Sequence, residues 1–323
     1  MIGRRLGRAL DWRFAAVTAR LDALNDRTER LHTHVDELHL RVAELTNKLD
    51  QLLEPAAGIP RLADAVTETR ATLEQRVQPL LRAIVDEESD NRRRLHALRA
   101  SPSYEQAYTD PNPLVSITLA TLGREGPLLD RALPSLLSQT HANLEVLVVG
   151  DAAPASVGEA VAALGDPRVQ YANLTHRIAA HPDPRRHWLV GSTMARNEAA
   201  RGARGTWLLH FDDDDRLHPD AIASLLQLAR EQRAEVAYGG FEEYHPDRRR
   251  VSGIGFPPRL GTFSWAGALV HAGLRFFERE LIAAYLELPG DMYMLERMLR
   301  AGVHFAMLDE IVLDYFPSTL WES

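Results

Sequence analysis

Residues 207–215 read WLLHFDDDD, a short apolar run that ends in four consecutive carboxylates. A buried strand cannot hold four like charges, so the carboxylates must leave the sheet together at the end of the strand. In open α/β sheets, ligands bind at that end of the strands. Because crowded carboxylates repel one another, we expect a hard cation such as Mg²⁺ among them. A solvated acidic turn is the competing interpretation, since Pro219 and Asp220 open a helical pattern just downstream.

The composition is that of a globular protein, and it excludes several kinds of site. The chain has 323 residues, of which 45% are hydrophobic, and it contains no cysteine. Disulfides, thiolate metal sites and cysteine nucleophiles are therefore excluded. Apolar runs stay far below the ~18 residues of a membrane span. The formal net charge is −8, and its acidic excess lies after residue 100, which argues against a nucleic acid partner.

The N-terminal end is basic, with Arg4, Arg5, Arg8 and Arg13, but it lacks the apolar core of a secretory signal. We therefore expect a cytoplasmic protein. A basic helix end also suits peripheral contact with the inner face of an anionic membrane, and simple solvation of the same residues is the competing interpretation.

A heptad pattern dominates residues 10–52. With one exception, Thr28, the residues that recur in steps of four and three are apolar: Leu10, Phe14, Val17, Leu21, Leu24, Thr28, Leu31, Val35, Leu38, Val42, Leu45, Leu49 and Leu52. The pattern predicts a coiled coil, and one helix alone cannot bury such a seam. Two partners stay open. One is a second copy, which would make a homo-oligomer through residues 10–52, and the other is a helical hairpin that turns at 55–60.

The chain is expected to have three parts. A helical coiled-coil segment covers residues 1–100 and includes a second, less regular helical stretch from about residue 61 onward. A linker covers residues 101–113, where three prolines and no periodicity occur. An α/β domain covers residues 114–323.

Strand and helix patterns alternate from residue 114 onward. We predict strands at 115–120, 144–149, 169–172, 207–211 and 235–239, and helices at 128–138, 157–164, 193–201 and 219–232. This alternation indicates a mostly parallel sheet flanked by helices. No G-x-G-x-x-G follows the first strand and no G-x-x-x-x-G-K-[ST] occurs, so dinucleotide and P-loop sites are poorly supported.

Four stretches of this domain resemble the family 2 glycosyltransferases, which have the GT-A fold. They are PLVSITLATLGR at 113–124, LLSQTHANLEVLVVGDA at 136–152, ARNEAARGARGTWLLHFDDDD at 195–215 and PGDMYMLERMLRAG at 289–302. Each stretch is short, but their order and spacing match the family pattern. The resemblance covers residues 114–323 and implies transfer of a sugar from a nucleotide donor.

The resemblance implies a donor pocket at the ends of the first two strands. Asp151 would contact the nucleotide base, and Thr121 and Arg124 would line the same pocket. Arg196 would reach the nucleotide or its diphosphate.

The resemblance also implies a metal site and a catalytic base. Asp212 and Asp214 would form the D-x-D pair of a Mn²⁺ or Mg²⁺ site, and Asp212 and Asp213 would also contact the donor. Asp291 would take the proton from the acceptor hydroxyl. This division of roles suits sugar transfer, which needs a cation opposite the leaving diphosphate and a carboxylate as base.

Three positions depart from the family pattern. Ala120-Thr121-Leu122-Gly123 replaces the usual Pro-Thr-Tyr-Asn, so an aromatic partner for the base is missing. Gly150-Asp151 replaces two aspartates, and Gly290-Asp291 replaces Glu-Asp.

Further candidates lie outside these motifs. The long polar loop at 175–188 is either a lid over donor or acceptor or a solvated loop. Phe263 and Trp265 are either an acceptor platform or core residues. His271 is either a metal ligand or a hydrogen-bonded structural histidine.

The sequence thus predicts a metal-dependent, inverting glycosyltransferase. Its donor would be a nucleoside diphosphate sugar, and its acceptor a carbohydrate or a lipid-linked molecule. The alternative is a non-catalytic coiled-coil scaffold with a vestigial sugar-nucleotide domain, against which the retention of Asp214 and Asp291 argues. A nucleotidyltransferase would need a Gly-rich loop with a lysine near the first strand, and 123–126 (Gly-Arg-Glu-Gly) is a poor substitute.

Overall fold

The structure is a computed structural model that describes residues 44, 78–178, 183–259 and 261–317. The chain divides into two compact units, Met1–Glu87 and Glu88–Ser323. Apart from Glu44, the predicted coiled coil at 10–52 lies outside the described residues, so the coil, the oligomer and the hairpin stay predictions. Within the described part, no helix is both long enough and apolar enough to cross a membrane.

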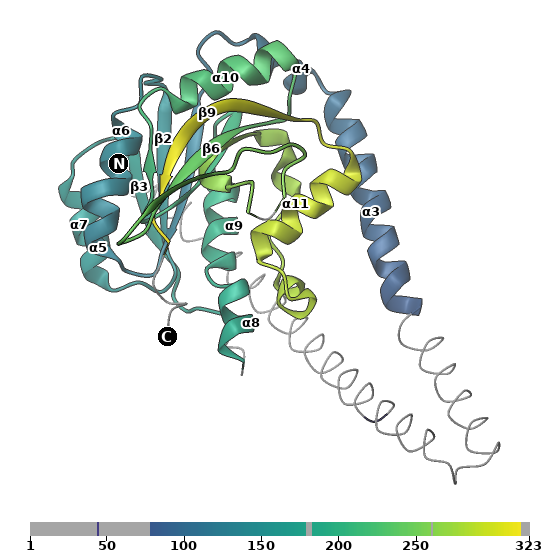
Figure 1. Ribbon diagram of the computed structural model, residues 1–323, viewed down its shortest axis with the longest axis horizontal. Coiled ribbons are helices and arrows are strands. Elements are labelled where there is room, and N and C mark those ends of the chain that lie inside the picture. The colour runs from purple at the N-terminus through teal and green to yellow at the C-terminus, as the bar shows by residue number, and fades with distance from the viewer. Residues whose placement is uncertain (1–43, 45–77, 179–182, 260, 318–323) are drawn as a thin grey trace, which may run out of the picture. The chain divides into compact units, whose positions relative to one another are not determined.

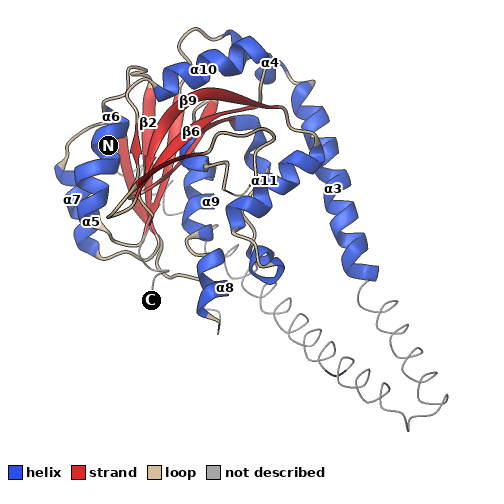
Figure 2. Ribbon diagram, viewed as in Figure 1, coloured by secondary structure: helices blue, strands red, loops and turns tan. Residues whose placement is uncertain are grey.

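A sheet forms the centre of the second unit, and the described residues contribute nine strands to it (Figures 1 and 2). The strand order is β3-β2-β1-β4-β8-β6-β9-β5, and β7 pairs with β6 outside this order. The strands are β1 (Val115–Thr121), β2 (Leu144–Gly150), β3 (Val169–Asn173), β4 (Trp207–Asp212), β5 (Arg216–Leu217), β6 (Val236–Tyr244), β7 (Arg249–Ser252), β8 (Ala268–His271) and β9 (Phe305–Tyr315).

The first four strands run parallel to one another, and β8 lies antiparallel between β4 and β6. Strands β1 and β2 are buried along their whole length, as near-continuous apolar strands of a parallel sheet are when helices cover both faces. Thr121 pairs with Gly150, and Ala120 pairs with Asp212. Strands β1, β2 and β4 therefore end side by side at one edge.

Helices cover both faces of this sheet (Figure 2). The helices are α3 (Gln78–Arg99), α4 (Pro102–Thr109), α5 (Glu125–Pro127), η2 (Leu128–Ala132), α6 (Leu133–Leu137), α7 (Ala155–Ala163), α8 (Pro184–Leu189), α9 (Thr193–Gly202), α10 (Ala221–Gln232) and α11 (Gly290–Ala301), with short turns η3 (Trp265–Gly267), η4 (Ala272–Phe276) and η5 (Leu281–Leu286). One core joins η2, α6, α7, α10 and α4 to the first face, and a second core joins α11 and the end of α3 to the other.

The alternation along β4 shows how one strand serves two cores. Trp207, Leu209 and Phe211 belong to the first core, whereas Leu208 belongs to the second. This two-sided burial confirms the predicted α/β class, a sheet flanked by helices, and the antiparallel pairs of β5, β7 and β8 make the sheet mixed. The predicted strands all form, but β5, β7, β8 and β9 were not predicted.

The structure differs from the expected linker at 101–113. Residues 102–109 form α4, and Tyr104, Ala107 and Tyr108 of this helix are buried. The Tyr108 ring packs edge-on against Trp207 at 5.5 Å, and the Trp207 indole N–H donates to the Ala107 carbonyl. Because these aromatic contacts bury the helix against the sheet, residues 102–109 belong to the compact unit that begins at Glu88.

Candidate active site at the carboxyl edge of the sheet

The four consecutive aspartates leave the sheet at the end of β4, beside the ends of β1 and β2. Thr121 lies at the last position of β1, and Asp151 directly follows β2. Since the strands are parallel and in register, the structure brings the predicted metal residues and the predicted donor residues to the same edge.

Arg124 neutralises two of the four aspartates. Its guanidinium forms ion pairs with Asp213 and with Asp214. Asp213 is 2% exposed, and its other oxygen accepts a hydrogen bond from the Thr121 hydroxyl at 2.6 Å. Arg131 also donates to the backbone carbonyl of Asp214 at 2.7 Å.

A glycine shapes the turn that carries Arg124 to this position. Gly123 has φ +118°, and a Cβ there would lie 2.8 Å from the Pro154 ring. The backbone N–H of Gly123 donates to the Thr121 hydroxyl at 3.1 Å. A residue with a side chain would therefore be strained and would collide with Pro154.

Arg196 of α9 neutralises the first aspartate of the run. Its guanidinium lies 2.6 Å from Asp212 Oδ1. Burial alone would raise the pKa of Asp212, but the charge and hydrogen bonding of Arg196 outweigh it and hold that pKa below its usual value. Arg196 thus lies beside Asp212, and its contact with the nucleotide or its diphosphate stays a prediction.

The ionised form is less favourable for Asp214 and Asp215 than for Asp212. Burial and the charges of Asp212 and Asp213 raise the pKa of Asp214 to about 6, although Arg124 opposes this shift. Asp215 is fully buried; one oxygen accepts from the Phe316 N–H at 3.0 Å, and the other has no hydrogen-bond partner. Burial raises the pKa of Asp215 well above its usual value, so this side chain is a buried structural acid.

The carboxylates fit a hard divalent cation in chemistry, since Mg²⁺ and Mn²⁺ prefer oxygen ligands. Among the residues that the structure describes, no group of three or more His, Asp or Glu side chains is gathered around a single metal position. Asp212, Asp213 and Asp214 instead contact arginines, so an ion at this position would compete with Arg124 and Arg196.

Asp151 is buried next to the end of β1. Its backbone N–H donates to the Thr121 carbonyl at 2.8 Å, and the Arg177 side chain donates to its carbonyl at 2.7 Å. Burial raises the pKa of the Asp151 carboxyl, although Arg177, Ser192 and Arg196 oppose the rise. The contact of Asp151 with a nucleotide base stays a prediction, because this carboxylate is 3% exposed and already hydrogen-bonds Ser192.

The departure at Gly150 has a packing reason. A Cβ at this position would lie 2.4 Å from the Asn173 amide oxygen and 2.6 Å from the Tyr171 hydroxyl. Asn173 is itself fixed by two hydrogen bonds with the backbone of Ala153. The usual aspartate at position 150 therefore cannot fit, and Asp151 is the acid that remains.

Asp291 lies in the first turn of α11, where a carboxylate is stabilised by free amides. Its Oδ1 accepts a hydrogen bond from the Met292 N–H at 2.8 Å. The Trp265 indole N–H donates to the Asp291 carbonyl at 3.0 Å. The charge of Asp291 acts on Arg196, as does that of Asp212, so Asp291 lies at the same site although α11 is distant in sequence.

For two further candidates that the sequence left open, the contacts favour the structural interpretation. His271 pairs with Trp207 at the start of β4, at the opposite end of that strand from Asp212, and it packs against Tyr104 at 5.0 Å. Its Nδ1 accepts from the Gly273 N–H at 3.0 Å, so it is a structural histidine. Phe263 and Trp265 are core residues rather than an acceptor platform, since both are about 95% buried.

The loop at 175–188 is described only in part, because residues 179–182 lie outside the described residues. Residues 184–189 form the short helix α8, in which Asp183 caps the Arg185 N–H at 2.9 Å. The charge of His187 acts on Asp151, so α8 borders the candidate donor pocket.

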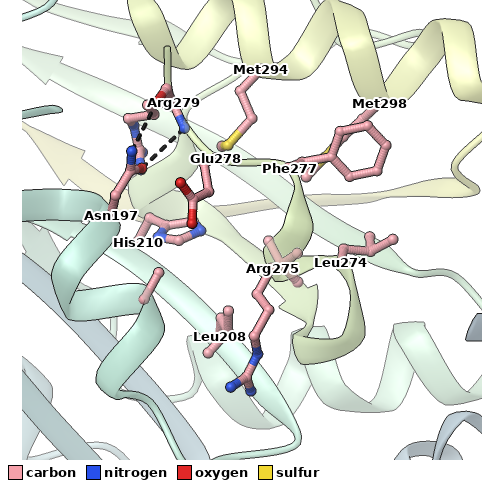
Figure 3. A pocket seen from close by; sticks show the side chains of 12 residues that line it. Asn197, Leu208, His210, Leu274, Arg275, Phe277, Glu278, Arg279, Met294 and Met298 are labelled. Carbon is pink, nitrogen blue, oxygen red and sulfur yellow. Dashed lines mark hydrogen bonds between the residues drawn. The ribbon is translucent and has the colours of Figure 1, made fainter. Parts of the chain in front are cut away.

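The sequence did not single out Arg279, a buried cation of the site. Figure 3 shows Arg279 and Asn197 among the residues that line a small cavity between α9, β4 and α11. The charges of Asp291 and Asp212 act on Arg279. A signal was available, because the triplet Glu278-Arg279-Glu280 stands between the apolar pairs 276–277 and 281–282.

Part of this chain matches a known protein family. The sequence profile described as Glycosyl transferase family 2 matches residues 116–264, a range that contains β1, β2 and β4 with their acidic ends. Asp291 lies beyond this range.

Three bacterial proteins are similar to part of the chain. ExoO of Rhizobium meliloti (strain 1021), a succinoglycan biosynthesis protein, is 30% identical over 142 residues, which are 44% of this chain and 37% of that protein. EpsJ of Bacillus subtilis (strain 168), an uncharacterized glycosyltransferase, is 29% identical over 46% of this chain and 38% of that protein. WcaA of Escherichia coli (strain K12), a colanic acid biosynthesis glycosyl transferase by name, is 32% identical over 36% of this chain and 37% of that protein. The chain thus spans less than two fifths of these relatives.

A solved structure shares the fold. The crystal structure of S. aureus TarS 1–349 in complex with UDP covers 63% of this chain and 60% of that chain, with a TM-score of 0.50 and 16% identity. The profile match and the named relatives show that this chain is similar to the glycosyltransferase family 2 over residues 116–264, and they support a glycosyltransferase enzyme. The TarS structure supports the predicted GT-A-type fold and no more than the fold.

Proposed function

We propose that this chain is a metal-dependent, inverting glycosyltransferase that moves a sugar from a nucleoside diphosphate sugar to a carbohydrate or lipid-linked acceptor. The names of two relatives, a succinoglycan and a colanic acid biosynthesis protein, favour a polysaccharide as the product. The UDP bound to TarS makes uridine nucleotides the first donors to test.

One observation carries the proposal. The charges of Asp212 from the end of β4 and Asp291 from the start of α11 both act on the same two cations, the partly exposed Arg196 and the buried Arg279. A donor whose diphosphate lies near Asp212 and Asp214 would have its sugar within reach of a carboxylate from α11. Acceptor, sugar and leaving group can then be held in line, which is a large part of what such an enzyme supplies.

The proposed transfer is a single displacement. The acceptor oxygen attacks the anomeric carbon of the donor sugar, and the carboxylate of Asp291 takes the proton that this oxygen loses. The bond between the anomeric carbon and the diphosphate oxygen breaks, and its electron pair leaves with the diphosphate. Attack from the face opposite the leaving group inverts the configuration at that carbon.

The chain's own cations take part in charge stabilisation. When bound at Asp212 and Asp214, a Mn²⁺ or Mg²⁺ ion supplies positive charge next to the leaving diphosphate. Arg196 already offsets the charge of Asp212, and Arg124 offsets that of Asp213 and Asp214. We propose that Arg124 and Arg196 turn toward the donor when an ion takes their place on the carboxylates.

The test is a thermal-shift screen of UDP-, GDP- and ADP-sugars with and without Mn²⁺. A donor present at about 100 times its Kd should raise the melting temperature by about 5 °C or more, and only with Mn²⁺ present. Slow hydrolysis of the same donor should accompany binding. The scaffold alternative predicts neither, so a protein with no shift and no hydrolysis across the panel would refute the proposal.

A further inference from the structure

Arg279 is a buried cation without a carboxylate partner in the described part of the chain. Its residue is 5% exposed. Its interactions with Asp291 and Asp212 are longer-range Coulombic attractions, and neither acid forms an ion pair or a hydrogen bond with it. Burial lowers its pKa to about 10, and the nearby charge of Arg196 adds to this effect. Burying a guanidinium without a counter-charge destabilises the fold. An anionic ligand beside Arg279 would offset that cost.

The acids that flank Arg279 in sequence are bound to other arginines. Glu278 forms an ion pair with Arg201 of α9, and Glu280 forms one with Arg297 of α11 at 2.7 Å. Each of the two acids therefore has a cation of its own, and no described carboxylate forms an ion pair with Arg279.

The backbone of Arg279 is held rigidly by α9. Asn197 donates from its amide nitrogen to the Arg279 carbonyl at 2.8 Å and accepts from the Arg279 N–H at 3.0 Å, the two dashed bonds of Figure 3. Asn197 follows Arg196, which contacts Asp212. One turn of α9 thus fixes both cations, Arg196 through its own helix and Arg279 through Asn197.

We propose that Arg279 binds the diphosphate of the nucleoside diphosphate, an assignment that rests on the proposed function. The guanidinium presents a planar fork of N–H donors that matches two phosphate oxygens. Negative charge grows on the diphosphate as it leaves, and a buried cation fixed beforehand stabilises that charge without reorganisation. Arg196 and Arg279 then act as a pair, with Arg279 free to meet the phosphate because no carboxylate holds it.

The test uses the full chain with Arg279→Met, which keeps much of the side-chain volume and removes the charge. Affinities for UDP and UMP are measured by calorimetry at saturating Mn²⁺, with GDP and ADP in parallel. We expect UDP affinity to fall about 10- to 100-fold, as for the loss of a charge-assisted bond to phosphate. UMP affinity should fall less than about threefold, because UMP lacks the second phosphate.

Stability gives a second readout. Without nucleotide, the melting temperature of Arg279→Met should equal or exceed that of the parent, because an unpaired buried charge has been removed. Arg279→Lys should restore part of the UDP affinity. The matched control is Arg275→Met, since Arg275 lines the same cavity but donates to the carbonyls of Ala272 at 2.9 Å and Ala203 at 3.1 Å. This control should bind UDP like the parent.

Four outcomes would overturn the assignment. Parental UDP affinity in Arg279→Met would do so directly. Equal losses for UDP and UMP with a lower melting temperature would make Arg279 a structural residue. A loss seen for UDP-glucuronate but not for UDP or UDP-glucose would place the bound anion on the sugar. A parent protein that binds no nucleoside diphosphate would overturn the proposed function, and this assignment with it.

Discussion

The Thr121 hydroxyl donates to Asp213 Oδ2 at 2.6 Å, so the end of β1 fixes the second of the four aspartates. Asp213 is 2% exposed, and its other oxygen forms an ion pair with Arg124. Asp213 therefore fixes the positions of Thr121 and Arg124. The side chains of Asp212 and Asp214 are 34% and 15% exposed, which makes them the carboxylates that a ligand can reach. The difference in exposure therefore separates two accessible carboxylates, Asp212 and Asp214, from two buried ones, Asp213 and Asp215.

Replacing Arg124 should expose the competition between its guanidinium and a metal ion. In Arg124→Gln, Asp213 and Asp214 lose their counter-charge, so Mn²⁺ affinity in the absence of nucleotide should rise by about three- to tenfold. Calorimetric titration with Mn²⁺ measures the change. The control is Arg168→Gln, which breaks a surface ion pair with Asp166 far from the acidic run in sequence. Unchanged or weaker Mn²⁺ affinity in Arg124→Gln would show that this arginine does not compete with the ion.

Asp214→Asn should abolish Mn²⁺-dependent nucleotide binding, and Asp212→Asn should weaken it less. Burial and the charges of Asp212 and Asp213 raise the pKa of Asp214 to about 6, so a bound cation would relieve this carboxylate most, whereas Arg196 at 2.6 Å already holds the pKa of Asp212 below its usual value. A neutral amide is a poor ligand for a hard cation, so we expect at least an approximately tenfold loss at Asp214. Nucleotide titrations with and without Mn²⁺ measure it, with the exposed Asp309→Asn as control. Parental Mn²⁺-dependent binding in Asp214→Asn would rule out the metal assignment.

Glu235 should make a pH-dependent contribution to stability. It is fully buried, and its carboxylate accepts from Arg99 at 2.6 and 2.8 Å, from the Tyr104 hydroxyl and from the His304 N–H. Burial alone would raise the pKa of Glu235, but these bonds outweigh it and the pKa is lowered. Glu235→Gln should lower the free energy of unfolding by about 2 kcal/mol at pH 7. This loss is smaller than the loss expected on breaking a fully buried ion pair, because solvent screens the partly exposed Arg99.

The sign of the pH effect follows from the lowered pKa. The contribution of Glu235 is complete above its unfolded pKa of about 4.3 and is lost as pH falls through the lower folded value. Denaturant unfolding of parent and Glu235→Gln should therefore differ by a constant amount from pH 7 to about 5, and the difference should shrink below about pH 4. The control is Glu105→Gln, whose ion pair with Arg233 is exposed on both sides. A difference that is independent of pH down to 3 would contradict this account.

The strands of the site could be predicted from the sequence because their signal is local. Strands β1, β2 and β4 are apolar runs that end in polar residues, and the parallel arrangement then fixes where those residues meet. The position of β8 between β4 and β6 could not be predicted, since it depends on pairing between distant segments. For the same reason, the sequence could not show that His271 lies at the far end of β4.

The missed features of the site are tertiary in origin. Tyr104, Ala107 and Tyr108 have helical spacing, but a helix of eight residues is too short for a convincing period. The sequence marks Glu278-Arg279-Glu280 as a charged triplet between apolar pairs, but it does not show which of the three lacks a partner. Only the folded chain shows that Arg201 and Arg297 take the carboxylates next to it.

Truncation should place the N-terminal boundary of the folded core near residue 88, before the predicted boundary at residue 100. A chain that begins at Glu88 should fold and bind nucleotide like the full chain, because the second compact unit starts there. A chain that begins at Ser103 should be less stable by several kcal/mol. It loses Leu95, which is 2% exposed and contributes about 2 kcal/mol, and it leaves Glu235 without Arg99. Equal stability of the two truncated chains would contradict this boundary.

Light scattering on the full chain and on residues 88–323 tests the predicted coiled coil. If residues 10–52 join two copies, the full chain should be an oligomer and the truncated chain a monomer. A monomeric full chain would favour the helical hairpin instead.

Asp291→Asn should separate catalysis from folding. An amide cannot accept the acceptor's proton at neutral pH, and loss of a general base typically costs ~10²–10⁴-fold in rate. The amide oxygen can still accept from the Met292 N–H, so the melting temperature should change little. Donor affinity should persist, because the acidic run and Asp151 are untouched. The measurements are turnover, donor Kd and melting temperature, and Glu296→Gln on the same helix, which breaks an exposed pair with Arg300, is the control. Near-parental turnover would leave Asp291 as a helix N-terminal residue and would require another carboxylate near Arg196 as the base.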